Sequence, residues 1–262
     1  MTMIARDITF TIGGKTILRD VNFTARPGQV TAIVGPNGSG KSTLLRIMSG
    51  EESARGTVTL NGLNVIARNA RDLARTRGVL QQATNMAFPF TVIEVLRIGL
   101  QAGPYALRPS VPEEALAAVG LADYASRYYH ELSGGEQQRT QLARVLCQVW
   151  EPVLNGTPSW LLLDEPVASL DIGHQLVIME LARRYADAGG GVVTVMHDLN
   201  LTALYADRMA LMQDGCIAAE GVPREVLTDE ILSKAYGCHL RVNAPPPPGW
   251  PYILPHMAQL TH

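Results

Sequence analysis

The amino-acid sequence predicts an α/β fold with a mainly parallel sheet, and two features of the chain support that prediction. The segment 35–42 reads Gly-Pro-Asn-Gly-Ser-Gly-Lys-Ser and lies between an apolar run and a helix-like run. The runs 160–163 and 192–196 are continuously apolar, as strands buried on both faces of a parallel sheet are. A strand, a glycine-rich loop and a helix in this order are typical of phosphate-binding folds.

Length and composition fit one large domain or a core with a subdomain. The chain has 262 residues, of which 47% are hydrophobic and 18% charged, and its formal net charge is −2. Its apolar runs are far shorter than the ~18–20 residues of a membrane span, and its start shows no secretory pattern. The lack of a basic tail or stripe argues against nucleic acid as the main partner. Three scattered cysteines suit a reducing compartment.

The N-terminal part alternates short β-like runs with glycine turns, which predicts an antiparallel β subdomain. Such runs lie at 8–12, 16–23 and 57–60. A buried strand at 30–34 leads into the glycine-rich loop, and a short strand ends at 79–80.

From about residue 84 to residue 150 the apolar spacing becomes helical, before strand-like runs return. We therefore expect a discontinuous core, residues 1–83 and 159–243, interrupted by a helical subdomain at 84–158. A proline-rich tail, 244–262, is expected to be a polyproline-like segment that lies over the surface.

The glycine-rich loop has the residues that bind the phosphates of a nucleotide. Its glycines allow backbone N–H groups to turn inward around phosphate oxygens, Lys41 supplies a charge for the β- and γ-phosphates, and Ser42 supplies a hydroxyl for Mg²⁺. The expected phosphate contacts are Gly35, Pro36, Asn37, Gly38, Ser39, Gly40, Lys41, Ser42 and Thr43.

Two adjacent carboxylates follow the apolar run at 160–163. Asp164 comes at the carboxyl end of a predicted parallel strand, where Mg²⁺ is held in folds with a phosphate loop. Glu165 points elsewhere and is suited to accept a proton from an attacking water. A salt-bridged carboxylate pair is the alternative, which the nearby phosphate loop makes the weaker one.

The segment Leu132-Ser133-Gly134-Gly135-Glu136-Gln137 comes just before a predicted amphipathic helix. Ser133 and Glu136 have the spacing of a capping box. A capping box does not require two adjacent glycines, which weaken a helix start but permit close approach to its exposed N–H groups, an anion-binding site.

The order of these motifs resembles that of the nucleotide-binding subunit of ABC transporters, over residues 3–240. The resemblance implies a P-loop NTPase core and two subunits paired head to tail, with each ATP held between the phosphate loop of one and the Leu-Ser-Gly-Gly segment of the other. It also implies that Ser133, Gly134 and Gly135 contact the γ-phosphate bound by the partner, and that the segment ending at Asp171 crosses the interface.

The same resemblance assigns further residues to the site. It makes His197, a lone histidine after the last core strand, a γ-phosphate contact, and Gln82 a Mg²⁺ contact that links the site to the helical insert. Gln81 stands where the family often has proline, so which glutamine serves is open, although the spacing to 88–92 favours Gln82. For the adenine, the family's aromatic position aligns with Ile12, while Phe10 lies on the same strand face and offers an alternative.

Together these implications give each of these residues a role in ATP hydrolysis. Glu165 polarises the attacking water, and His197 and Lys41 steady the γ-phosphate. Mg²⁺ is held by Ser42, Asp164 and Gln82, the last of which also counts among the catalytic residues.

The resemblance also suggests what the ATPase drives. With no membrane span of its own, an ABC motor docks on two separate transmembrane permease subunits, and the segment 88–90 is either a docking surface or a buried hinge. Among importers the chain looks closest to the haemin-import ATPases, in the segments 88–92, 151–158, 221–237, 240–242 and 251–255. That implies an indirect periplasmic haem-binding partner and a peripheral place on the cytoplasmic face of a bacterial inner membrane.

Other functions stay open at this point. Iron–siderophore and vitamin B12 importer ATPases share much of the same pattern. A soluble ABC ATPase acting on DNA or ribosomes is the alternative from another class, although such proteins carry two cassettes or a long coiled coil. A small-molecule kinase leaves the Leu-Ser-Gly-Gly segment unexplained.

Overall fold

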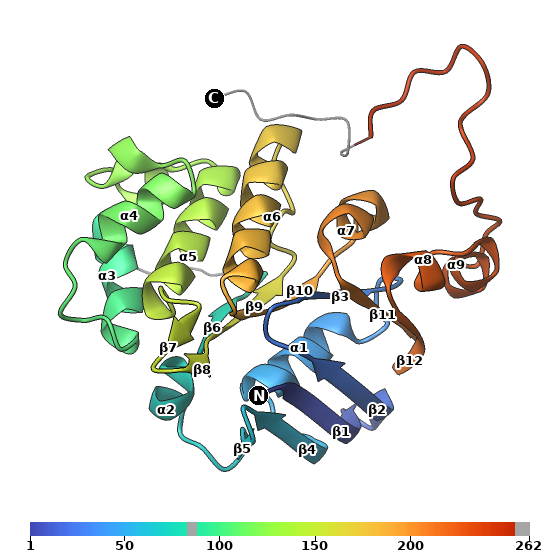
Figure 1. Cartoon of the computed structure of the whole chain (residues 1–262), viewed down its shortest axis with the longest axis horizontal. Coiled ribbons are helices and arrows are strands. Elements are labelled where there is room, and N and C mark those ends of the chain that lie inside the picture. The colour runs from blue at the N-terminus through green and yellow to red at the C-terminus, as the bar shows by residue number, and fades with distance from the viewer. Residues whose placement is uncertain (83–87, 255–262) are drawn as a thin grey trace.

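The computed structural model describes residues 1–82 and 88–254, which form two stacked sheets and a group of helices at one side (Figure 1). The larger sheet has six strands in the order β12-β11-β3-β10-β9-β6. These strands are β12 (Cys216–Gly221), β11 (Arg208–Gln213), β3 (Val30–Val34), β10 (Gly191–Val195), β9 (Trp160–Asp164) and β6 (Arg77–Leu80). All neighbouring pairs are parallel except β11 and β12, which confirms the predicted α/β class.

The N-terminal sheet is antiparallel, as predicted, with strand order β2-β1-β4-β5. Its strands are β1 (Met3–Ile12), β2 (Lys15–Ala25), β4 (Arg55–Leu60) and β5 (Leu63–Asn64). The tight turn between β1 and β2 uses Gly13 and Gly14, both at positive φ, which matches the right-handed twist of a two-residue hairpin.

The central strands are buried on both faces, and each face belongs to a different core. Val30, Ala32 and Val34 pack with the helices α5 (Gly134–Gln148) and α6 (Ile172–Asp187). Ile33 points the other way, into a core shared with α1 (Lys41–Ser49) and the antiparallel sheet. Successive side chains of a strand point to opposite faces of the sheet, and here both faces are buried. The strand sequences are therefore continuously apolar.

The inserted segment is built on α3 (Val92–Ala102), α4 (Val111–Ala118) and α5. Helices α3 and α5 pack closely at Gly99, where an added Cβ would lie 2.0 Å from the carbonyl oxygen of Arg144. The segment ends with a hairpin that we did not predict, β7 (Val153–Leu154) and β8 (Thr157–Pro158). Its turn, Asn155-Gly156, has positive φ at both residues. An Asn-Gly pair is typical of such turns, so this pair could have predicted the hairpin.

The remaining helices are α2 (Ala70–Ala74), α7 (Leu199–Tyr205), α8 (Pro223–Val226) and α9 (Asp229–Tyr236). Short 3-10 helices cover Ala122–Tyr124 and Tyr129–Glu131. No helix within residues 1–82 and 88–254 is long and apolar enough to cross a membrane.

The tail differs from expectation in its packing. Residues 244–254 form neither helix nor strand, and Trp250 and Ile253 are 72% and 79% exposed, so they do not lie against the surface. The four prolines that precede them lack N–H groups, and the segment therefore has few donors with which to bind the body of the protein.

Candidate nucleotide site

The phosphate loop lies where β3 ends and α1 begins, at the carboxyl edge of the parallel strands. Gly35, Gly38 and Gly40 all have positive φ. At Gly35 an added Cβ would lie 2.1 Å from the carbonyl oxygen of Met212 on β11, so this position also requires glycine for space. The loop shape therefore depends on glycine for both conformation and packing.

Lys41 is buried at the first position of α1, and its side chain folds back over the loop. Its Nζ donates hydrogen bonds to the carbonyl oxygens of Gly35 and Pro36, each at 2.9 Å. Burial lowers the pKa of Lys41 from its ordinary value, and the charges of Glu165 and Asp164 oppose that shift. An anion placed at this lysine would take over hydrogen bonds that the loop carbonyls now accept.

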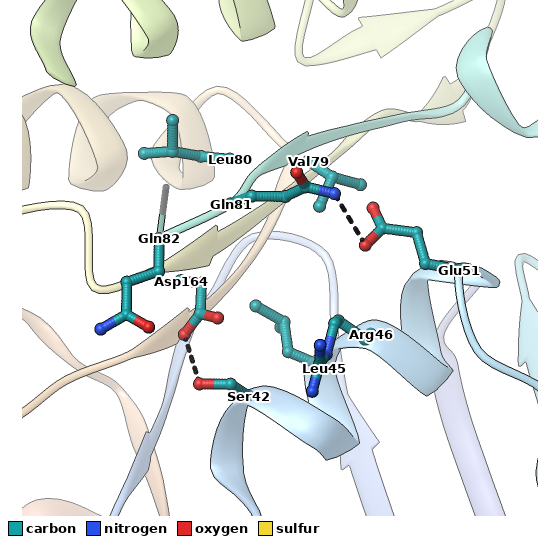
Figure 2. Close-up of a pocket in the computed structure, with 9 residues that line it drawn as sticks. All are labelled: Ser42, Leu45, Arg46, Glu51, Val79, Leu80, Gln81, Gln82 and Asp164. Atoms are coloured by element: carbon teal, nitrogen blue, oxygen red, sulfur yellow. Dashed lines mark hydrogen bonds between the residues drawn. The ribbon is translucent and has the colours of Figure 1, made fainter. Parts of the chain in front are cut away.

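Ser42 and Asp164 face each other from α1 and the end of β9 (Figure 2). The Ser42 hydroxyl donates to Asp164 Oδ1 at 2.9 Å. Burial raises the pKa of Asp164 above its ordinary value, and the hydrogen bond from Ser42 opposes this effect. Gln82 lines the same pocket, so the three residues assigned to the metal border one space.

Glu165 lies directly after β9, and its backbone is left-handed, with a φ of 52°. Its carboxylate accepts a hydrogen bond from Gln82 Nε2 at 2.9 Å, and its other oxygen lies 2.6 Å from His197 Nε2. The side chains of Gln82, Glu165 and His197, far apart in the sequence, therefore meet at one point beside the phosphate loop.

These residues border a cavity of about 690 Å³, within the range of ligand sites. Its lining comes from the phosphate loop, from β2 and from the group around Glu165. The lining residues are Lys15, Ile17, Asn37, Gly38, Gly40, Lys41, Ser42, Thr43, Gln82, Glu165 and His197.

The two residues expected at the adenine are not among those that line this cavity. Phe10 packs against the core between the sheets, and Ile12 is 62% exposed beside the hairpin turn. Lys15 and Ile17 of β2 line the cavity instead, because β2 passes close to the phosphate loop. An added Cβ at Gly40 would lie 3.4 Å from the carbonyl oxygen of Ile17, which shows how closely β2 approaches.

The Leu-Ser-Gly-Gly segment lies apart from the cavity, at the start of α5. The predicted capping box is present: the Ser133 backbone N–H donates to Glu136 Oε2 at 2.8 Å, and the Glu136 N–H donates to Ser133 Oγ at 3.4 Å. Gly134 is exposed, with no atom within 4 Å of an added Cβ. The helix start is therefore open to a group from outside the chain.

Asp171 also lies outside the cavity and caps α6. Its Oδ1 accepts the backbone N–H of His174 at 2.9 Å, and its Oδ2 lies 2.7 Å from His174 Nδ1. Ser169, two residues earlier, is left-handed, with a φ of 64°. The segment between Glu165 and α6 is thus a defined turn that presents its polar groups outward.

The structure adds two contacts that sequence reasoning missed. Gln138 Nε2, on α5, donates to the backbone oxygen of Glu165 at 2.8 Å, which ties the inserted helices to the carboxylate. Gln81 Nε2 donates to Glu51 Oε2 at 3.0 Å (Figure 2), a bond that proline at this position could not make. Both depend on tertiary packing and carry no local sequence signal.

Comparison with known proteins agrees with this geometry. The family model described as ABC transporter matches residues 18–168, and the chain belongs to this family as an ATP-hydrolysing, ATP-binding subunit. Its curated relatives include two proteins named hemin import ATP-binding protein HmuV. The protein of Roseobacter denitrificans is 58% identical over 98% of this chain and 99% of its own length. The protein of Jannaschia sp. is 56% identical over 99% of this chain and 96% of its own length.

Solved structures show the same fold. An ATP-binding cassette of an ABC transporter has a TM-score of 0.77 at 25% identity, covering 90% of this chain and 98% of its own. A bacterial ABC transporter cassette solved as a dimer has a TM-score of 0.73 at 26% identity, covering 85% of this chain and 99% of its own.

Proposed function

We propose that this chain is the ATP-hydrolysing subunit of a haemin importer. The observation that carries the proposal is the identity of 58% and 56% to two proteins named for hemin import, over nearly the whole of each chain. The names of these relatives do not favour the alternatives, iron–siderophore and vitamin B12 import, and the experiment below distinguishes both from haemin import.

In the proposed reaction, ATP lies in the cavity over the phosphate loop, with its terminal phosphate between Lys41 and the group around Glu165. Lys41 gives up its bonds to the loop carbonyls and stabilises the negative charge of the γ-phosphate. Glu165 accepts a proton from the attacking water, and His197, 2.6 Å from that carboxylate, steadies the γ-phosphate.

The residues also fit a magnesium ion. The hydroxyl of Ser42 and the carboxylate of Asp164 already lie side by side, and Gln82 adds an amide oxygen; hard oxygen donors of this kind are what Mg²⁺ prefers. When bound, Mg²⁺ neutralises the charge that develops on the phosphate oxygens.

A second copy of the chain completes the proposed site. The start of α5 is exposed and lies outside the cavity of its own chain, which leaves Ser133, Gly134 and Gly135 free to contact ATP held by a partner. The turn before Asp171 would then lie at the interface. The dimeric cassette among the structural relatives supports such an assembly.

The membrane partners would be two permease subunits, supplied by other chains. Phe88 is 69% exposed and stacks edge-on against Phe90, with ring centroids 6.1 Å apart, and it follows Gln82 by six residues in the sequence. This exposure favours the docking role of the segment over a buried hinge. The subunit would thereby be peripheral to the cytoplasmic face of an inner membrane, with a periplasmic haem-binding protein on the other side.

The test is ATP hydrolysis by the chain reconstituted in proteoliposomes with its genomically adjacent permease and binding protein. Haemin-loaded binding protein should raise the ATPase rate above that with the empty binding protein, and Glu165→Gln should abolish both rates. Stimulation by an iron–siderophore or cobalamin instead of haemin would contradict the haemin assignment while leaving the ATPase assignment intact.

A further inference from the structure

A second polar cavity, of about 330 Å³, lies between the two sheets and away from the nucleotide site. It is bordered by the end of β2, the start of β3, the start of β11 and the end of β12. The lining residues are Phe23, Thr24, Arg26, Gln29, Thr31, Arg208, Met209, Ala210 and Glu220.

The strand register places the polar groups of the larger sheet on one face of this cavity. Arg208 is paired with Thr31, and Glu220 is paired with Ala210. Since Arg208 and Ala210 are two residues apart on one strand, the side chains of Arg208, Thr31 and Glu220 share the face that looks toward the antiparallel sheet. Arg26 approaches from that sheet, just beyond the end of β2.

The floor of the cavity holds a buried hydroxyl without a partner. Thr31 is 2% exposed, and its Oγ1 makes no hydrogen bond. A buried hydroxyl without a partner costs free energy, and in native proteins such a group commonly bonds to a water, an ion or another ligand.

The positive charges around the hydroxyl are only partly compensated. Among the residues described, neither Arg26 nor Arg208 takes part in an ion pair. Asp207, next to Arg208, is already occupied: its Oδ2 accepts the N–H of Val30 at 2.7 Å and pairs with Arg183. With Glu220 as the one carboxylate of the lining, the cavity has a net charge of +1 from two arginines and one glutamate.

We propose that this cavity is a binding site for a small oxyanion, a ligand that bears a phosphate or carboxylate group. Two guanidinium groups would hold the anion, since arginine binds both groups through paired N–H donors, and the Gln29 amide and the Thr31 hydroxyl would complete its hydrogen bonds. The site lies at the amino end of β3, whose carboxyl end begins the phosphate loop, so the ligand would contact the strand that positions Lys41.

The test is isothermal titration calorimetry on the full chain saturated with the non-hydrolysable ATP analogue AMP-PNP, which occupies the phosphate loop up to the γ-phosphate position. Inorganic phosphate and succinate are the two probes, and sodium chloride at equal ionic strength is the reference. Binding of one probe with a stoichiometry of one per chain is expected, and which probe binds more tightly distinguishes a phosphate-bearing from a carboxylate-bearing ligand.

The variants separate this site from general charge effects. Arg208→Ala should weaken binding about tenfold or more, the usual effect of losing a hydrogen bond to a charged group. Glu220→Gln should instead tighten binding, because it removes the one opposing charge.

Thr31→Val has a matched control in Thr194→Val. Both residues are buried threonines whose hydroxyls have no partner, but Thr194 lines no part of this cavity. Only Thr31→Val should weaken binding, by about tenfold for the loss of one hydrogen bond to a charged group. Absence of saturable binding by either probe, or equal binding by wild type and Arg208→Ala, would overturn the proposal.

Discussion

Glu165 carries the largest share of the proposed chemistry, and its surroundings fix its position on three sides. Its backbone is left-handed, its carboxylate contacts Gln82 and His197, and its carbonyl oxygen accepts a hydrogen bond from Gln138. A left-handed non-glycine residue is uncommon and persists where surrounding contacts hold it, often at functional sites. The carboxylate is thus placed before a nucleotide arrives.

Glu165→Gln should reduce ATP hydrolysis by about 10²- to 10⁴-fold, the usual contribution of a general base. ATP affinity should stay within a few-fold of wild type, because the phosphate contacts come from the loop. Steady-state phosphate release and equilibrium ATP binding measure the two quantities. Wild-type turnover in this variant would remove Glu165 from its role as base.

For single residues, sequence reasoning succeeded where a local motif fixes the role of a residue. The capping box of Ser133 and Glu136 is confirmed in this way. It did not identify Lys15 and Ile17 as lining residues. Alternation along β1 shows which side chains share a face, but which of two paired strands passes over the loop depends on how the hairpin packs on the rest of the chain.

At the scale of elements, α5 connects the composite parts of the site. Its start carries the Leu-Ser-Gly-Gly segment, its body packs on α3, and Gln138 on its first turns contacts the backbone of Glu165. A displacement of this helix would therefore change the position of the Glu165 carboxylate.

The cap of α5 predicts a pH dependence. Hydrogen bonds from the Ser133 side chain, and then from its backbone, lower the pKa of Glu136 from 4.5 to about 2. A lowered folded-state pKa stabilises the fold above the unfolded-state pKa, and this contribution is lost as pH falls from about 4.5 toward about 2.

Urea unfolding of wild type and Glu136→Gln between pH 7 and pH 3 tests this. The stability advantage of wild type should be constant at neutral pH and should shrink once pH falls below about 4.5. An advantage that does not change with pH would show that the charge of Glu136 does not contribute.

The contact between α3 and α5 predicts a packing effect at Gly99. Gly99→Ala places a methyl group 2.0 Å from the carbonyl oxygen of Arg144, so the helices must separate, at a cost of about 1–3 kcal/mol in the free energy of unfolding.

Gly134→Ala is the matched control, since nothing lies within 4 Å of the added methyl group in the isolated chain. Chemical denaturation should show a loss of stability for Gly99→Ala and none for Gly134→Ala. The activity of Gly134→Ala should nevertheless fall, because its position is proposed to meet the nucleotide of a second copy. Equal stability of both variants would contradict the packing argument.

At the scale of the whole molecule, one chain holds both halves of the proposed shared site, and these halves lie apart from each other. The phosphate loop lines the cavity, while the start of α5 faces solvent elsewhere. The sequence predicted the sheets, the helical insert and the motif order, because each leaves a local pattern. The hairpin at 153–158 and the exposed tail were not anticipated, since short strands and unpacked segments leave weaker patterns.

Mixing two inactive variants tests the composite site. Lys41→Ala loses the phosphate contact and Ser133→Arg blocks the signature segment, so each should be inactive alone. A mixed dimer contains one site with an intact Lys41 and an intact Ser133, and mixing should restore hydrolysis up to about one quarter of the wild-type rate if chains pair at random and sites act independently. No recovery at any mixing ratio, or full activity of Ser133→Arg alone, would argue against a shared site.

The two hydrogen bonds from Lys41 to its own loop have a consequence for the working cycle. The ammonium group of Lys41 donates to two loop carbonyls and the Ser42 hydroxyl donates to Asp164, so bonds within the chain hold the loop. Each arriving nucleotide exchanges existing bonds for new ones, which moderates its affinity and makes release easier. An ATPase that must release its product in every cycle benefits from these intramolecular hydrogen bonds.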